Sequence, residues 1–497
     1  MSRVSGILMA VSSLPSKYGI GCFSKSAYEF IDQLKQSGQK YWQILPLGPT
    51  GYGDSPYQSF STFAGNPYYI SLEDLIQEGL LTIEECENID WESNPKYIDY
   101  EKIYENRFGL LKLAYTRSKT NLDVGFEKYC RENSWWLDDY ALFMSIKDLY
   151  SGNSWDKWPE DIRMRNKTAM EYYKRELHFE IGFYKFVQYK FSMQWAKLKN
   201  YANHNDISII GDIPIYVAFD SSDTWANPKL FQLNEENIPI AVAGCPPDAF
   251  ASTGQLWGNP LYRWEYHREN NFSWWLKRID HSFKLYDALR IDHFRGFDEY
   301  YSIPYGDNTA QNGHWEKGPG MDLFRIVKKY FGDKLIIAED LGFVTDSVRK
   351  LVEQSGYPGM KVIEFAFDGR DTGSASDYLP HNYKRDSVVY TGTHDNETLV
   401  SWYQKITAEE RNMVRDYLQN YTTPDEEIYK SIIALVMESV ADICIIPIQD
   451  YLGLDDCARL NTPSTLGNNW KWRLQKNQFS VGLRKQILKL TMIYGRG

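Results

Sequence analysis

A chain of 497 residues with 43% hydrophobic and 24% charged residues has the composition of a folded globular protein, long enough for one large α/β barrel with insertions or for several domains. Acidic residues outnumber basic ones and leave a net charge of −11. Because no long basic run occurs, nucleic acid and anionic membrane surfaces are disfavoured as main partners. Aromatic residues make up 15% of the chain, which favours a neutral ligand with apolar faces.

The cysteines and histidines carry no metal-site or redox pattern. Six cysteines are scattered without a CxxC pair, which favours a reducing compartment, and eight histidines include no HxxxH or similar cluster. We therefore expect neither a metal nor a cofactor. The apolar run at 6–11 is too short for a signal peptide, and no segment approaches the roughly 18 apolar residues of a membrane span. We expect a soluble, full-length, cytoplasmic protein with no obligate protein partner.

Eight short apolar runs, each followed by Gly, Pro, Asp or other polar residues, predict buried parallel strands. The runs cover residues 6–12, 41–47, 207–217, 288–294, 335–339, 360–367, 387–393 and 443–449. Helical periodicity follows several of them: after the fifth run, Val348, Leu351 and Val352 share one face, and Gly356 closes the helix. Neither GxGxxG nor GxxxxGK[ST] supports a nucleotide-binding sheet. The alternation predicts one (β/α)8 TIM barrel over residues 1–497.

Two insertions are expected to interrupt the barrel. About 160 residues separate the second and third runs, where a barrel needs roughly 30 to 40. A Ser71/Asp74 capping pair and the periodic apolar stretch 172–198 predict a mainly helical insertion over 66–200. The range 218–277 is rich in Pro, Gly, Asn and Trp, so we expect a loop-rich insertion with small β structure at the active face.

Polar residues at the carboxyl ends of barrel strands face the catalytic mouth. A single acid there is more often a helix cap or an ion-pair partner, but here several predicted strands each carry one at the same end. The candidates are Asp212, Arg290, Asp292, Glu339, His394 and Asp395.

This set suits chemistry on a glycosidic bond. A retaining mechanism needs a carboxylate nucleophile and a carboxylic acid about 5 Å apart. Arg290 lies two residues before Asp292, so both side chains point to one face of a strand, and the guanidinium keeps that carboxylate ionised. Asp292 is therefore the predicted nucleophile. Glu339, whose pKa neighbouring anions raise, is the predicted acid/base.

Long motifs then carry a resemblance that spans nearly the whole chain. They are LPSKYGIG (14–21), LPLGPTGYGDSPYQSFSTFAGNPYYI (45–70), GDIPIYVAFDSSDTW (211–225), AGCPPDAFASTGQLWGNPLY (243–262), ALRIDHFRGF (288–297), IIAEDLG (336–342), GTHDNETL (392–399) and RLNTPSTLGNNWKWR (459–473). By these segments the sequence resembles the 4-α-glucanotransferases, the amylomaltase or disproportionating-enzyme family related to the α-amylase clan.

The resemblance implies roles for individual residues. Asp292 corresponds to the family's nucleophile, Glu339 to its acid/base and Asp395 to a third carboxylate that grips sugar hydroxyls. The segment after 243 resembles a mobile active-site loop, and Ser464 stands where relatives usually have glycine. The implied substrate-binding residues are Tyr57, Asp212, Asp248, Phe250, Gln255, Trp257, Arg290, His394 and Asn461. The aromatic residues expected to border a glucan groove are Tyr52, Tyr57, Phe60, Trp225, Phe250, Trp257 and Trp470.

The implied reaction is a double displacement through a covalent β-glucosyl-enzyme. It moves α-1,4-glucan segments from a donor maltodextrin to the 4-hydroxyl of an acceptor glucan or of glucose, so the expected partners are glucans, maltooligosaccharides and glucose. Two alternatives stay open. An α-glucan hydrolase would use the same acids with water as acceptor, and a non-catalytic glucan-binding protein would use the aromatic residues for stacking alone.

Overall fold

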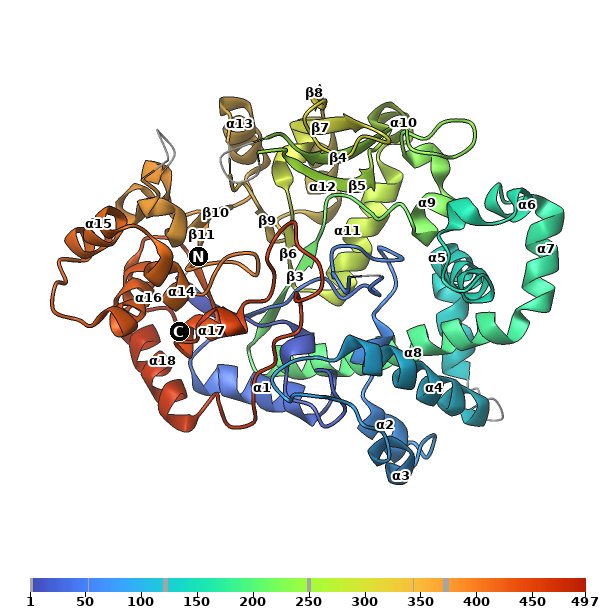
Figure 1. The fold of residues 1–497 in the computed structure, drawn as a ribbon, viewed down its shortest axis with the longest axis horizontal. Helices are drawn as coiled ribbons and strands as arrows, with labels where there is room; N and C mark the ends of the chain where they lie inside the picture. The colour runs from blue at the N-terminus through green and yellow to red at the C-terminus, as the bar shows by residue number, and fades with distance from the viewer. Residues whose placement is uncertain (1–2, 52, 119–123, 248–251, 343, 370–374) are drawn as a thin grey trace.

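A closed barrel of eight parallel strands forms the centre of the protein (Figure 1). The computed structural model describes residues 3–51, 53–118, 124–247, 252–342, 344–369 and 375–497. The barrel strands are β1 (Val4–Leu8), β2 (Tyr41–Gln43), β3 (Ser208–Ile213), β6 (Ala288–Ile291), β9 (Ile336–Ala338), β10 (Gly359–Val362), β11 (Ser387–Tyr390) and β12 (Ile443–Pro447). Each of them overlaps one of the eight predicted runs, with β1 and β10 beginning one or two residues earlier than predicted, and this confirms the TIM barrel.

The strands are shorter than the apolar runs that predicted them. The run 360–367 covers most of β10 but continues as a 3-10 turn over Ile363–Phe367, in which most side chains are as buried as those of the strand. Because burial on all sides removes the alternation that marks a strand, an apolar run cannot show where the strand stops and a buried turn begins.

Helices after the strands cover the barrel. They are α1 (Lys25–Gln36), α11 (Ser273–Leu285), α12 (Met321–Phe331), α13 (Asp346–Ser355), α14 (Leu399–Lys405), α15 (Ala408–Leu418), α16 (Ile428–Glu438), α17 (Ile448–Tyr451) and α18 (Val481–Ile493). Helix α13 shows why they form here. The Thr345 hydroxyl accepts a hydrogen bond from the Val348 amide at the start, and Gly356, with φ +71°, ends the helix as predicted.

The long segment between β2 and β3 is helical and extends to one side of the barrel (Figure 1). Its helices are α2 (Leu72–Gln77), α3 (Ile83–Glu87), α4 (Tyr100–Ser118), α5 (Val124–Leu149), α6 (Glu160–Arg163), α7 (Lys167–Glu176) and α8 (His178–His204). The Ser71 hydroxyl caps α2 by accepting from the Asp74 amide at 3.1 Å. Helices α5 and α8 pack against each other through aromatic residues such as Tyr140 and Tyr184, whose ring centroids are 6.3 Å apart.

A small antiparallel sheet, in the order β5-β4-β7-β8, lies beyond the carboxyl end of β6 (Figure 1). Between β3 and β6 the chain forms α9 (Ser222–Ala226), β4 (Ala241–Cys245), β5 (Gln255–Pro260) and α10 (Trp264–Glu269); β7 (Glu299–Pro304) and β8 (His314–Lys317) follow β6. We expected β structure within 218–277 but did not predict β7 and β8. Strand β7 joins the sheet by pairing with β4, and β8 joins it by pairing with β7.

The expectation that Trp225 borders a ligand groove is wrong. Trp225 is 1% exposed and packs against Phe143 and Trp158 of the helical segment, with the Arg165 guanidinium 4.3 Å from its ring centre. Much of the aromatic surplus is therefore core. Within the described residues, no helix combines the length and hydrophobicity needed to cross a membrane.

Candidate active site

One guanidinium group connects three barrel strands. Arg290, near the end of β6, is 3% exposed and donates from Nη1 to Asp212 Oδ2 at 2.5 Å and from Nη2 to Asp292 Oδ1 at 3.0 Å. Its Nη2 also lies 3.8 Å from Glu339 Oε2. Asp212 is the fifth residue of β3, while Asp292 and Glu339 directly follow β6 and β9. Strand alternation places Arg290 and Asp292 on one face, as predicted.

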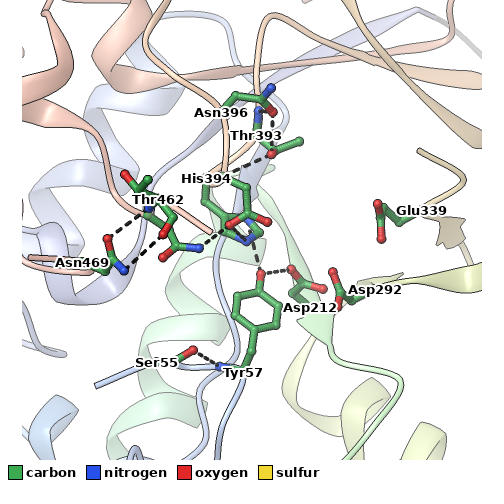
Figure 2. Close-up of polar contacts among 12 residues, drawn as sticks. Ser55, Tyr57, Asp212, Asp292, Glu339, Thr393, His394, Asn396, Thr462 and Asn469 are labelled. Carbon is green, nitrogen blue, oxygen red and sulfur yellow. Dashed lines mark hydrogen bonds and ion pairs between the residues drawn. The ribbon is translucent and has the colours of Figure 1, made fainter. Parts of the chain in front are cut away.

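Asp292 and Glu339 lie at the rim of this cluster, where a ligand can reach them. Their side chains are 26% and 16% exposed, whereas the Asp212 side chain is fully buried. The close-up places them on one side of the site, opposite Tyr57 and His394 (Figure 2). A carboxyl group at such a rim is partly desolvated and still accessible, which suits proton transfer and attack on a substrate.

The two rim carboxyl groups have different proton affinities. Burial, together with the nearby Asp292 charge and against the opposing effect of Arg290, raises the pKa of Glu339 to about 8. Burial also raises the pKa of Asp292, but only to about 6, because Arg290 is closer to it. Near neutral pH, Glu339 is therefore the protonated acid and Asp292 the ionised carboxylate.

Asp395, in the loop after β11, is held ionised by its neighbours. Its Oδ1 accepts a hydrogen bond from Asn461 Nδ2 at 2.6 Å and lies 3.3 Å from His394 Nε2. Burial alone raises the pKa of Asp395, but the contacts with His394 and Asn461 outweigh it and lower that pKa to about 2. The third predicted carboxylate is thus an anion throughout the physiological range.

Tyr57 joins the loop after β2 to the far side of the barrel mouth. Its hydroxyl donates to Asp212 Oδ2 at 2.7 Å, and its ring stacks on His394 with a centroid distance of 4.9 Å and an interplanar angle of 15° (Figure 2). Trp470 lies 5.9 Å from Tyr57 and 5.8 Å from His394, centroid to centroid. The three rings form one aromatic cluster beside the acids.

Strand β5 contributes the remaining described candidates. Trp257 Nε1 donates to Gln255 Oε1 at 3.0 Å, and the Trp257 ring meets the His293 ring edge to face at 4.8 Å. The antiparallel sheet therefore touches the segment that carries Asp292. The predicted ligand-binding residues Asp248 and Phe250, and Tyr52 among the aromatic residues expected to border the groove, lie outside the described residues.

Comparisons with known proteins agree with the motifs. A family model described as 4-alpha-glucanotransferase matches residues 9–478. This chain belongs to the 4-alpha-glucanotransferase family. It is 50% identical over 490 residues to a 4-alpha-glucanotransferase from Clostridium butyricum, covering 98% of this chain and 100% of that protein. A 4-alpha-glucanotransferase from Streptococcus pneumoniae serotype 4 is 48% identical over 498 residues, with 99% and 97% of the two chains covered.

Solved structures extend the likeness to the whole fold. Amylomaltase from Streptococcus agalactiae, solved in complex with acarbose, matches with a TM-score of 0.95 and 39% identity, and each chain is covered completely. The family resemblance drawn from the motifs is thus confirmed. All three acids lie inside the matched family range.

Sequence reasoning missed two contributors to this 4-alpha-glucanotransferase site. Arg459 Nη2 donates to the Asp395 carbonyl at 2.7 Å and its Nε donates to the Asn461 carbonyl at 2.8 Å, so it ties two loops together. Its place two residues before Asn461 in one motif was an available signal. His293 is not among the predicted site residues, yet its backbone amide donates to Glu339 Oε2 at 2.5 Å. A backbone contact leaves no residue-type signal.

Two further observations concern the local chemistry. Within the described residues, no group of three or more His, Cys, Asp or Glu side chains is arranged to hold a metal ion.

Ser464, where the resemblance led us to expect glycine, has φ +63°, a left-handed conformation that glycine adopts without strain. The loop thus retains the backbone conformation suited to the family's usual glycine.

Proposed function

We propose that this protein is a retaining 4-α-glucanotransferase that moves α-1,4-glucan segments from a donor maltodextrin to the 4-hydroxyl of an acceptor glucan or of glucose. The observation that carries the proposal is the shared guanidinium. One nitrogen of Arg290 lies 3.0 Å from Asp292 Oδ1 and 3.8 Å from Glu339 Oε2. Those two oxygens are therefore no more than about 7 Å apart, which is compatible with a retaining pair.

In the first step, Glu339 gives its proton to the glycosidic oxygen while an Asp292 oxygen attacks C1. The C1–O bond breaks, the reducing-end fragment leaves with that proton, and a β-glucosyl ester forms on Asp292. The higher pKa of Glu339 and the ion pair between Asp292 and Arg290 support this division of roles. If the two roles were exchanged, Asp292 would have to carry the proton although it is ion-paired with Arg290.

In the second step, the Glu339 carboxylate removes the proton from the acceptor 4-hydroxyl, whose oxygen attacks C1 and releases Asp292. Two inversions at C1 retain the α configuration. Asp395, kept anionic by His394 and Asn461, is placed to accept hydrogen bonds from hydroxyls of the reacting sugar. Tyr57, stacked on His394, and Trp257, packed on His293, offer aromatic surface for sugar rings near the acids.

Product analysis with maltotriose tests the proposal. The wild type is expected to yield a ladder of shorter and longer oligosaccharides together with glucose, whereas Asp292→Asn and Glu339→Gln lose the ladder. Asp346→Asn, a change at an exposed acid on α13, serves as the control and retains it. Products limited to glucose and maltose would identify a hydrolase instead. Maltotriose binding without any turnover would identify a glucan-binding protein.

The cellular compartment is part of the same proposal. All six cysteines lie within the described residues and none forms a disulfide, which supports a reducing environment. We place the protein in the cytoplasm, where detection of the activity in the soluble fraction of lysed cells, and its absence from the medium, is the expected result.

A further inference from the structure

His293 has a backbone conformation that is uncommon for residues other than glycine. It directly follows Asp292 and has φ +51° and ψ +50°, in the left-handed region. A non-glycine residue is rarely found there, and such strain persists only where the surroundings hold it; it is concentrated at functional sites. The residue before it belongs to the reacting pair, and the residue after it begins the 3-10 turn Phe294–Phe297.

Three consecutive amides around this residue have fixed acceptors. The Asp292 amide donates to the Ile213 carbonyl at 2.9 Å, and the Phe294 amide donates to the Glu339 carbonyl at 3.0 Å. Between them, the His293 amide donates to the Glu339 carboxyl group at Oε2. The φ and ψ angles of His293 set the orientation of its two flanking peptide groups relative to each other, so the left-handed conformation lets the His293 amide meet the Glu339 side chain while the Phe294 amide stays on the Glu339 carbonyl.

The imidazole of His293 acts as a packed spacer. Burial lowers its pKa to about 3, so the ring is neutral, and its Nε2 has no hydrogen-bond partner among the described residues. The Trp257 ring stands at 89° to it with centroids 4.8 Å apart. Gly296 closes the other side, since a Cβ there would lie 3.2 Å from His293 Cδ2. The ring thus fills the space between β5 and the segment that carries Asp292.

From these contacts we propose that His293 is a positioning residue for the acid/base Glu339. Its left-handed backbone keeps an amide hydrogen on the Glu339 carboxyl group, and Trp257, packed on the imidazole, holds that backbone in place. The inference rests on the proposed function, because it assigns His293 a task through Glu339. His293 acts only through Glu339, by the hydrogen bond from its backbone amide, and its imidazole has no chemical role.

An amide donor stabilises the ionised form of a carboxyl group and so limits how far burial raises its pKa. The other groups that face Glu339 come from three further segments of the chain. They are Arg290 and Asp292 at β6, Asp395 in the loop after β11, and Tyr378 in the 3-10 turn Ala375–Tyr378. If the amide turns away while these groups stay, the pKa of Glu339 rises, and the pH at which activity falls on the alkaline side rises with it.

The test compares His293→Val with His293→Asn in the full chain, using pH profiles of maltotriose disproportionation. Valine is β-branched and resists the left-handed region, whereas asparagine adopts it readily. We expect His293→Val to lower kcat by about 10- to 100-fold. The same variant should move the alkaline limb up by about one pH unit, the equivalent of one charge-assisted hydrogen bond. His293→Asn should keep the wild-type limb, and Trp257→Ala should shift it in the direction of the valine variant, by less.

The outcomes separate this inference from a structural role and from the proposed function. If His293→Val loses activity with its alkaline limb unmoved, or if His293→Asn shifts the limb as far as valine does, the amide has no positioning role. Thermal melting and maltotriose calorimetry show whether each variant folds and binds. His293→Ala, a smaller disturbance of the left-handed residue, replaces valine if that variant does not fold, and is expected to shift the limb upward. A wild type without any transfer activity would overturn the proposed function instead.

Discussion

Glu339→Gln should stabilise the protein at neutral and alkaline pH while it removes the activity. In the folded chain the pKa of Glu339 is raised from its ordinary 4.5 to about 8, with burial as the largest cause and Asp292 as the second. The stabilising effect of holding this proton is fully present below pH 4.5 and is lost as pH rises to about 8, because the unfolded chain ionises in that window and the folded one does not. Glutamine keeps the shape and can still accept the His293 amide.

The magnitude follows from the shift. At about 1.4 kcal/mol per pKa unit, the wild type loses about 3 to 4 kcal/mol between pH 5 and pH 8 through this group, and the variant loses none of it. The unfolding entropy of a chain of this length makes each kcal/mol about 1 °C in Tm. The Tm of Glu339→Gln should therefore exceed that of the wild type by about 3 to 4 °C more at pH 8 than at pH 5.

Differential scanning fluorimetry of both proteins across pH 5 to 8 measures this difference. Asp346→Asn removes an exposed carboxylate on α13 and should show a Tm offset that does not change with pH. A pH-independent offset for Glu339→Gln, or a variant less stable than the wild type at pH 8, would refute the assignment of Glu339 as the buried, proton-holding acid.

One pH profile and two substitutions test the site further. The wild-type pH profile of kcat/KM should be bell-shaped, with limbs near pH 6 and pH 8 that belong jointly to the two acids on Arg290; a flat profile over that range contradicts the coupling. Asn461→Ala removes the 2.6 Å hydrogen bond to Asp395 and should lower kcat/KM by about 10- to 100-fold in steady-state assays, while wild-type kinetics would show that the bond has no catalytic value. Tyr57→Phe keeps the ring stack but takes one of two donors from buried Asp212. It should lower Tm by about 1 to 3 °C and kcat/KM by about tenfold, and unchanged melting would show that the hydroxyl contributes nothing.

The sequence by itself determined the barrel, because its evidence is local. An apolar run such as 443–449 indicates a parallel strand that is buried on both faces. The Ser71/Asp74 pair indicates the start of a helix through a capping hydrogen bond, and Gly356 indicates the end of one through its left-handed conformation. The candidate acids could be predicted for the same reason. Once the strands are known, polar residues at or just after their carboxyl ends face the barrel mouth.

Tertiary structure alone decided how those residues work together. No local pattern places the Tyr57 hydroxyl 2.7 Å from Asp212, 155 residues away, or folds Trp225 into the helical segment instead of a ligand groove. The order of the two acid pKa values depends on burial and on distances to one guanidinium, which exist only after the barrel closes. The amide of His293 is invisible to any motif, because every residue except proline has one, and only the tertiary structure brings it to Glu339.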